Sequence, residues 1–130
     1  VERMTSDVLK AVKTAMQELG LDYAFRRFRR KLEYPYFIGD YMETDPMSED
    51  GLQECTFTLT GFARGAGAET TLEAAKGKIR NYFTQEGRAF PLADGSVVVI
   101  AYGNALPIPA EDAELDRIQI NLTIKEWSVN

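Results

Sequence analysis

Two clusters of acidic residues are the first features of this 130-residue chain whose types and spacing suggest chemistry. Neighbouring carboxylates can act as general acid and base, or hold a cation, when burial or coupling shifts their pKa values. Both clusters lie among residues typical of turns, and neither has the pattern of an EF-hand. We therefore interpret them as solvated loops rather than as a catalytic or calcium site. They comprise Asp45, Glu49 and Asp50 in one loop, and Glu111, Asp112, Glu114 and Asp116 in another.

The residue types needed for most catalytic and metal sites are scarce. The chain has no histidine and one cysteine, Cys55, which removes the commonest general base and any conventional zinc site. Cys55 alternates with Phe57 and Leu59, so we expect a small buried core residue. The glycine-rich residues 61–67 precede a predicted helix, where backbone amides can bind phosphate. Their spacing matches neither the dinucleotide fingerprint nor the P-loop. We expect a flexible connection there, no catalytic residue, no metal site and no cofactor.

A run of basic residues interleaved with Phe25 and Phe28 is the most unusual local feature. Such a run can bind single-stranded nucleic acid, because bases stack on the rings and phosphates pair with the cations. On a chain with a net charge of −5 and a pI of about 4.8, we favour a charged face or a subunit contact that pairs with the acidic loops. Trp127 lies on the polar-facing side of the last strand, where it indicates either a partly covered sheet edge or an interface anchor. The candidate interface residues are Arg26, Arg27, Arg29, Arg30, Lys31, Glu111, Asp112 and Trp127.

Two amphipathic helices are expected to support these segments. Apolar residues recur at helical spacing over residues 6–19, with Ser6 as a candidate N-cap and Gly20 as a left-handed stop. A second helix is predicted to open at Thr70, because Thr70 and Glu73 have the spacing of a capping box. Its apolar stripe consists of Leu72, Ala75, Ile79, Tyr82 and Phe83.

The remaining segments predict strands. The run from Val97 to Tyr102 is continuously apolar, which is typical of a central strand covered on both faces. The last strand, predicted from Leu115 to Trp127, alternates strictly and presents a polar row of Gln119, Asn121, Thr123 and Lys125. Between these two strands, residues 103–114 are predicted to form a long connection. Further strands are expected near residues 23–25, over residues 36–43, from about residue 54 to Gly61, and before an Ala-Asp-Gly turn at residues 93–95.

The composition is that of an ordinary globular chain, with 45% hydrophobic and 27% charged residues. Its length fits a single domain over residues 1–130. No run of 18 apolar residues occurs, so no membrane span is expected. The order of elements predicts an α+β fold: a mostly antiparallel sheet with two amphipathic helices packed on one face.

The order of several segments resembles the tail terminator, or tail completion, proteins of long-tailed bacteriophages and prophages. The resemblance covers most of the chain from Tyr34 onward. It lies in the general character and order of the segments rather than in a short signature motif. It is carried by Tyr-Pro-Tyr-Phe-Ile-Gly-Asp-Tyr at residues 34–41, Glu-Asp-Gly at 49–51, Phe-Thr-Leu-Thr-Gly-Phe at 57–62, Leu-Glu-Ala-Ala-Lys at 72–76, and residues 117–127.

The resemblance implies an assembly role without catalysis or cofactor. Such proteins have two helices on a small sheet and form a ring, commonly of six subunits, on the last ring of the tail tube. The ring stops tube growth and presents the surface to which the filled head attaches. The implied partners are further copies of the chain, the tail tube protein and the head–tail connector, with DNA only passing through the lumen. The implied locations are the bacterial host cytoplasm during assembly and then the virion tail.

Two alternatives remain open from the sequence. One is a head–tail connector or another minor tail component, which differs in what it binds at each end. The other is a nucleic-acid-binding module that uses residues 25–31, for which binding should weaken steeply with salt. An enzyme that uses the acidic loops is disfavoured, since no histidine or reactive cysteine accompanies them.

Overall fold

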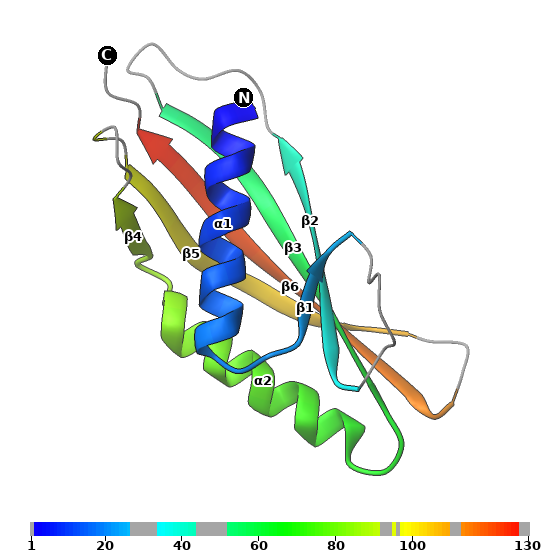
Figure 1. Ribbon diagram of the computed structural model, residues 1–130. Helices are drawn as coiled ribbons and strands as arrows, with labels where there is room; N and C mark the ends of the chain where they lie inside the picture. Colours follow the sequence, from blue (N-terminus) through cyan, green and yellow to red (C-terminus); the bar gives the residue numbers. More distant parts are fainter. Residues whose placement is uncertain are drawn as a thin grey trace.

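The computed structural model describes residues 2–26, 34–43, 52–91, 95, 97–109 and 113–127. Within these ranges, only the backbone is described for residues 2–8, 42–43, 52–54 and 127. The α+β class predicted from the sequence is confirmed, as a curled, mixed six-stranded sheet with two helices (Figure 1). The elements are α1 (Glu2–Glu18), β1 (Tyr23–Phe25), β2 (Tyr36–Glu43), β3 (Leu52–Arg64), α2 (Ala68–Phe83), β4 (Arg88–Pro91), β5 (Val97–Ile108) and β6 (Leu115–Trp127).

The strand order in the sheet is β1-β2-β3-β6-β5-β4. β3 and β6 form its centre and pair antiparallel along their whole length, from Leu52↔Trp127 to Arg64↔Leu115. The pairings β2–β3, β5–β6 and β4–β5 are also antiparallel, whereas β1 runs parallel to β2. The strand predicted to end at Gly61 therefore continues to Arg64, because its ladder with β6 continues that far.

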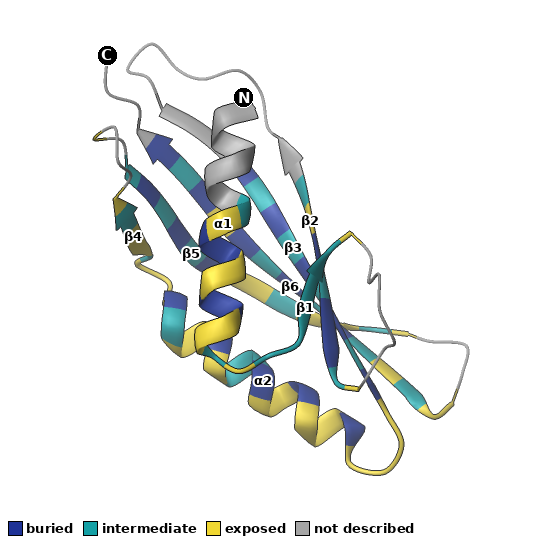
Figure 2. Cartoon of the chain, viewed as in Figure 1, coloured by how far each residue is buried: buried dark blue, intermediate teal, exposed yellow. Residues whose placement is uncertain are grey.

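The hydrophobic core contains side chains of both helices and of the sheet, and Figure 1 shows α1 crossing in front of the sheet. Buried positions on both helices recur at helical spacing (Figure 2), and each fully buried Leu, Ile or Phe side chain contributes roughly 1.5–3 kcal/mol. The core includes Val12, Ala15 and Met16 of α1, Leu72, Ala75, Ile79 and Phe83 of α2, and Phe37, Cys55, Phe57, Leu59, Val98, Ile100, Ile118, Ile120, Leu122 and Ile124 of the strands. The buried position predicted for Cys55 is confirmed.

The helix starts differ from the prediction. α1 begins at Glu2, so Ser6 lies inside the helix and is not its N-cap. α2 begins at Ala68, and its N-cap is Gly67, which has φ 82 and makes no side-chain cap bond. The capping box at Thr70 and Glu73 is therefore wrong: the left-handed glycine starts the helix earlier, and both residues face solvent.

The end of α1 agrees with the prediction. Gly20 has φ 72, and the Leu21 amide donates to the Met16 carbonyl at 3.0 Å, as in a left-handed helix stop. The chain then turns directly into β1.

The long connection predicted over residues 103–114 is wrong, because β5 continues to Ile108 and pairs with β6 as far as Arg117. Pro107 suggested a loop, yet proline also occurs in strands with an open edge. Among the described residues, no strand pairs with β5 beyond Ile100 on the side of β4. The resulting β5–β6 hairpin extends past the paired part of β4.

A bulge explains how the hairpin changes register. The pairing between β5 and β6 shifts between Tyr102 and Asn104. Gly103 occupies the shift, where an added Cβ would lie 2.8 Å from the carbonyl oxygen of Asn121. The close approach of two backbones therefore requires glycine at this position.

The apolar run of β5 does not mark a strand buried on both faces. β5 does have a neighbour on each side, but its side chains alternate between buried and half-buried. Val98, Ile100 and Tyr102 face the core, whereas Val97 and Val99 face the other way. Hydrophobic composition alone overestimated the burial of this strand.

Candidate interaction surface

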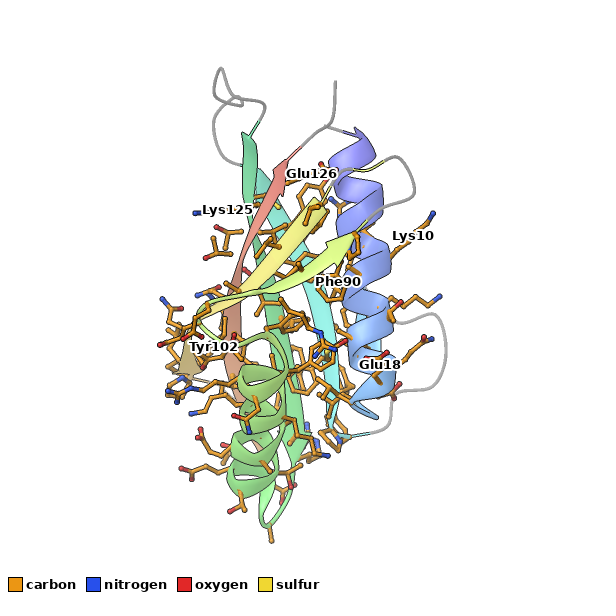
Figure 3. All side chains as sticks on the ribbon, turned by 90° about the vertical axis from the view of Figure 1, so that its left-hand side faces the viewer. Lys10, Glu18, Phe90, Tyr102, Lys125 and Glu126 are labelled. Carbon is orange, nitrogen blue, oxygen red and sulfur yellow. The ribbon has the colours of Figure 1, made fainter. Side chains whose placement is uncertain are left out.

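The face of the sheet that points away from the core is the largest surface with a distinctive chemistry. We call it the outer face; it consists of the strand residues that alternate with the core residues. In β6 the alternation predicted from the sequence is confirmed, since every second side chain from Ile118 to Ile124 is buried. Figure 3 shows Glu126 on the side of α1 and Lys125 on the opposite, outer side. No described helix covers the outer face.

A network of neutral side chains occupies the centre of the outer face. The Asn121 amide oxygen accepts hydrogen bonds from Thr58 Oγ1 at 3.2 Å and Gln119 Nε2 at 3.0 Å. The Asn121 Nδ2 donates to Asn104 Oδ1 at 2.7 Å. The network joins β3, β6 and β5 and holds donors and acceptors in fixed positions. Its members are neutral hydrogen-bond donors and acceptors, which can bind water or other polar groups.

One end of the outer face is aromatic and aliphatic. The register places Tyr36, Phe62, Arg117 and Ile108 side by side across four strands. The rings of Tyr36 and Phe62 stack at 4.8 Å between centroids, and Tyr34 lies 5.3 Å from Tyr36. Tyr34 is 42% exposed and Leu106, on the neighbouring row, is 46% exposed. Among the described residues, Tyr34 and Leu106 are the exposed large hydrophobic ones, and both lie at this end of the outer face. We call Tyr34, Tyr36, Phe62, Leu106 and Ile108 the end patch.

Charged groups surround the end patch. The Arg64 guanidinium lies 5.6 Å from the Tyr34 ring centroid and 3.8 Å from the Glu114 carboxylate. Arg117 donates to the Pro109 carbonyl, and its Nε is buried without a hydrogen-bond partner. Burial raises the pKa of Tyr36, the neighbouring Tyr34 raises it further, and Arg64 opposes the shift. The aromatic and arginine composition is that of a protein interface.

The basic segment singled out in the sequence begins directly after β1, the terminal strand of the sheet. Arg26 follows β1, and its guanidinium lies 5.0 Å from the Phe25 ring centroid, 5.6 Å from that of Tyr41 and 3.3 Å from Asp40 Oδ1. Its amide donates to the Gly39 carbonyl at 2.8 Å. Arg26 is thus an exposed cation anchored on two aromatic rings. The other basic candidates, Arg27, Arg29, Arg30 and Lys31, lie outside the described residues.

Several of the acidic candidates lie outside the described residues. Glu111 and Asp112 are not described, nor are Asp45, Glu49 and Asp50 of the first acidic cluster. The backbone of Trp127 ends β6, but its side chain is not described. Among the described residues, no group of three or more His, Cys, Asp or Glu side chains is arranged to hold a metal ion.

A small pocket lies between α1 and β1. Its volume is about 290 Å³, and it is lined by Leu9, Lys13, Tyr23, Ala24 and Phe25. Burial raises the pKa of Tyr23 far above its ordinary value, and its hydroxyl has no hydrogen-bond partner. The lining is largely apolar and offers one cation, from Lys13.

Sequence reasoning missed the end patch. The alternation of Tyr34 with Tyr36 could have indicated a shared face, but their neighbours Phe62 and Leu106 are distant in the chain. Leu106 was also assigned to a loop. Only the register of β2, β3, β6 and β5 brings these residues together.

Comparison with known proteins supports the fold alone. No protein-family model and no curated protein matches this chain. A solved structure, whose description gives no activity, ligand or partner, superposes with a TM-score of 0.67 and 14% sequence identity. The match covers 98% of this chain and 99% of that chain. Among the described residues, no helix has the length and hydropathy needed to cross a membrane.

Proposed function

We propose that this chain is a structural protein of phage or prophage tail assembly: a ring-forming tail terminator that caps the tail tube and offers the head-joining surface. The sequence resemblance motivates this role. The structural observation that supports it is an outer sheet face that no described helix covers and that carries a fixed neutral network and an exposed end patch. Such a face suits protein contacts.

In this proposal the two faces of the sheet have different roles in assembly. In this proposal the two amphipathic helices share one face of a mostly antiparallel sheet, and the opposite face is left for partners. The partners are other copies in a ring, commonly six, together with the tail tube protein and the head–tail connector. The neutral centre around Asn121 would let DNA pass a lumen without binding it tightly, because tight binding needs cations. Assembly takes place in the bacterial host cytoplasm, and the product resides in the virion tail.

Electron microscopy of particles from a prophage that lacks this gene tests the role. A tail terminator predicts overlong or irregular headless tails beside filled, tailless heads, since nothing stops tube growth. Tails of normal length with unattached heads would instead support a head–tail connector. Wholly normal particles would contradict both roles and favour nucleic-acid binding by residues 25–31. Re-expression of the chain from a plasmid is the control, and it should restore normal particles.

A further inference from the structure

We infer that the sheet edge formed by β4 and the end of β5 is protected against the addition of a strand from another chain. We call it the β4–β5 edge. An exposed edge strand presents unpaired backbone N–H and C=O groups, to which an extended segment of another chain can bind. The inference goes beyond the proposed function, because it concerns the isolated chain whatever that chain assembles with.

A hydrogen bond fixes which backbone groups of β5 face the β4–β5 edge. The Tyr102 amide donates to the carbonyl of Thr84, which precedes β4, at 2.7 Å. The Tyr102 amide therefore points away from β6. Along an antiparallel strand, successive residues direct their backbone groups to opposite neighbours. Val98 and Ile100 consequently face β4, whereas Ala101 faces β6.

The bulge in β5 changes this alternation. β6 pairs with β3 without a register shift, so every second β6 residue over 117–123 continues to face β5. Asn104 and Leu106 pair with two of these residues, and their backbone groups therefore point to β6. It follows that the backbone groups of Ala105 and Pro107 point to the β4–β5 edge.

Pro91 of β4 occupies an equivalent position. Its neighbour Phe90 pairs with Val98, which faces β4, so the backbone nitrogen of Pro91 points away from the sheet. Proline has no N–H, so Pro91 and Pro107 each remove a donor where an added strand would need one. Among the described residues of β5 beyond the bulge, Ala105 alone directs an amide N–H to the β4–β5 edge.

This arrangement opposes pairing between chains. An added strand would meet carbonyl groups with few donors, beside a bulge that interrupts the register. Prolines and bulges are features by which sheet edges avoid pairing with other chains. Protection matters here because Leu106, on the same stretch of strand, is 46% exposed, and an exposed hydrophobic edge strand favours aggregation. Partners of this chain should therefore bind to its side chains at this edge rather than extend its sheet.

Hydrogen exchange of the parent chain, followed by NMR, tests the assigned directions. The Ala105 amide should exchange at least about tenfold faster than the amides of Asn104 and Leu106, which are assigned to the ladder with β6. Equal protection of the three amides, or the reverse order, would overturn the inference. This measurement needs no variant, so it does not depend on how a substitution affects folding.

Restoring the missing donors tests the protection itself. Sedimentation velocity should show a chain with Pro91→Val and Pro107→Val self-associating at least about tenfold more tightly than the parent, because each restored donor acts twice when two like edges pair. Leu106→Val is the matched control. It raises strand propensity without adding a donor at the edge, so it should leave association unchanged.

Circular dichroism and urea unfolding establish whether each variant is folded. A folded double variant that associates no more tightly than the parent overturns the inference. An equal increase for Leu106→Val also overturns it, since strand propensity would then explain the effect. If the double variant does not fold, Pro107→Val alone is measured against the same two outcomes.

Discussion

At the scale of single residues, hydrogen bonds hold several exposed side chains in fixed orientations. Asn121 illustrates this, because its one amide accepts two hydrogen bonds and donates a third on an uncovered sheet face. The Tyr82 hydroxyl similarly donates to Glu18 at 2.6 Å and connects the ends of α2 and α1. The Arg88 guanidinium lies 3.9 Å from the Tyr82 ring centroid. Such contacts restrict the orientations of the side chains that make them.

We expect Asn121→Ala to lower the free energy of unfolding by about 1 kcal/mol, because three neighbours lose their shared partner on a partly solvated surface. Urea unfolding followed by circular dichroism measures this loss. Thr123→Ala is the control on the same face of the same strand, since Thr123 is exposed. It should change the unfolding free energy by less than about 0.5 kcal/mol. Equal losses in the two variants would contradict a special role for Asn121.

At the scale of elements, two glycines in different environments should respond oppositely to alanine. A Cβ at Gly103 would lie 2.8 Å from the carbonyl oxygen of Asn121, so Gly103→Ala should force the bulge apart and cost roughly 1–3 kcal/mol. Gly77 lies within α2 with nothing within 4 Å of an added Cβ. Gly77→Ala should therefore stabilise the chain by about 1 kcal/mol through helix propensity. Thermal unfolding of both variants checks the two signs, and a stabilising Gly103→Ala would disprove the close approach.

Periodicity predicted most of the elements, and its failures have local causes. β6 was predicted with its observed ends, because strict alternation from Ile118 to Ile124 reflects one buried face. The end of β5 was missed, because Gly103 and Pro107 are typical of loops and only pairing with β6 stabilises them in a strand. The start of α2 was misplaced, because the capping-box spacing of Thr70 is common and the left-handed Gly67 determines the start instead.

At the scale of the whole molecule, the candidate surface was less predictable than the elements. The polar row from Gln119 to Lys125 follows from alternation in a single strand and was expected to lie on one face. The end patch requires Tyr34, Phe62 and Leu106 to meet across strands whose register depends on the bulge at Gly103. No local pattern encodes that register, so the patch emerges only from the assembled sheet.

The stability of the whole chain should fall at alkaline pH because of buried tyrosine. Burial raises the pKa of the Tyr23 hydroxyl above its ordinary value of 10.0. Once the pH passes that ordinary value, the unfolded chain releases this proton while the folded chain retains it. The unfolded state then binds fewer protons, so the free energy of unfolding decreases as the pH rises. The contribution is complete below the ordinary tyrosine pKa and is lost as the pH approaches the raised one.

Tyr23→Phe isolates this effect, because lysines also titrate in the alkaline range but are the same in both chains. The unfolding free energies of parent and variant should agree within about 1 kcal/mol at neutral pH, since the Tyr23 hydroxyl has no hydrogen-bond partner to lose. Above the ordinary tyrosine pKa of 10.0, the parent should lose stability more steeply than the variant. Tyr82→Phe is the contrasting variant: it removes the hydrogen bond to Glu18, so it should already lower the midpoint at neutral pH. Parallel alkaline slopes for the parent and Tyr23→Phe would show that this hydroxyl reaches water in the folded chain, which would contradict its burial.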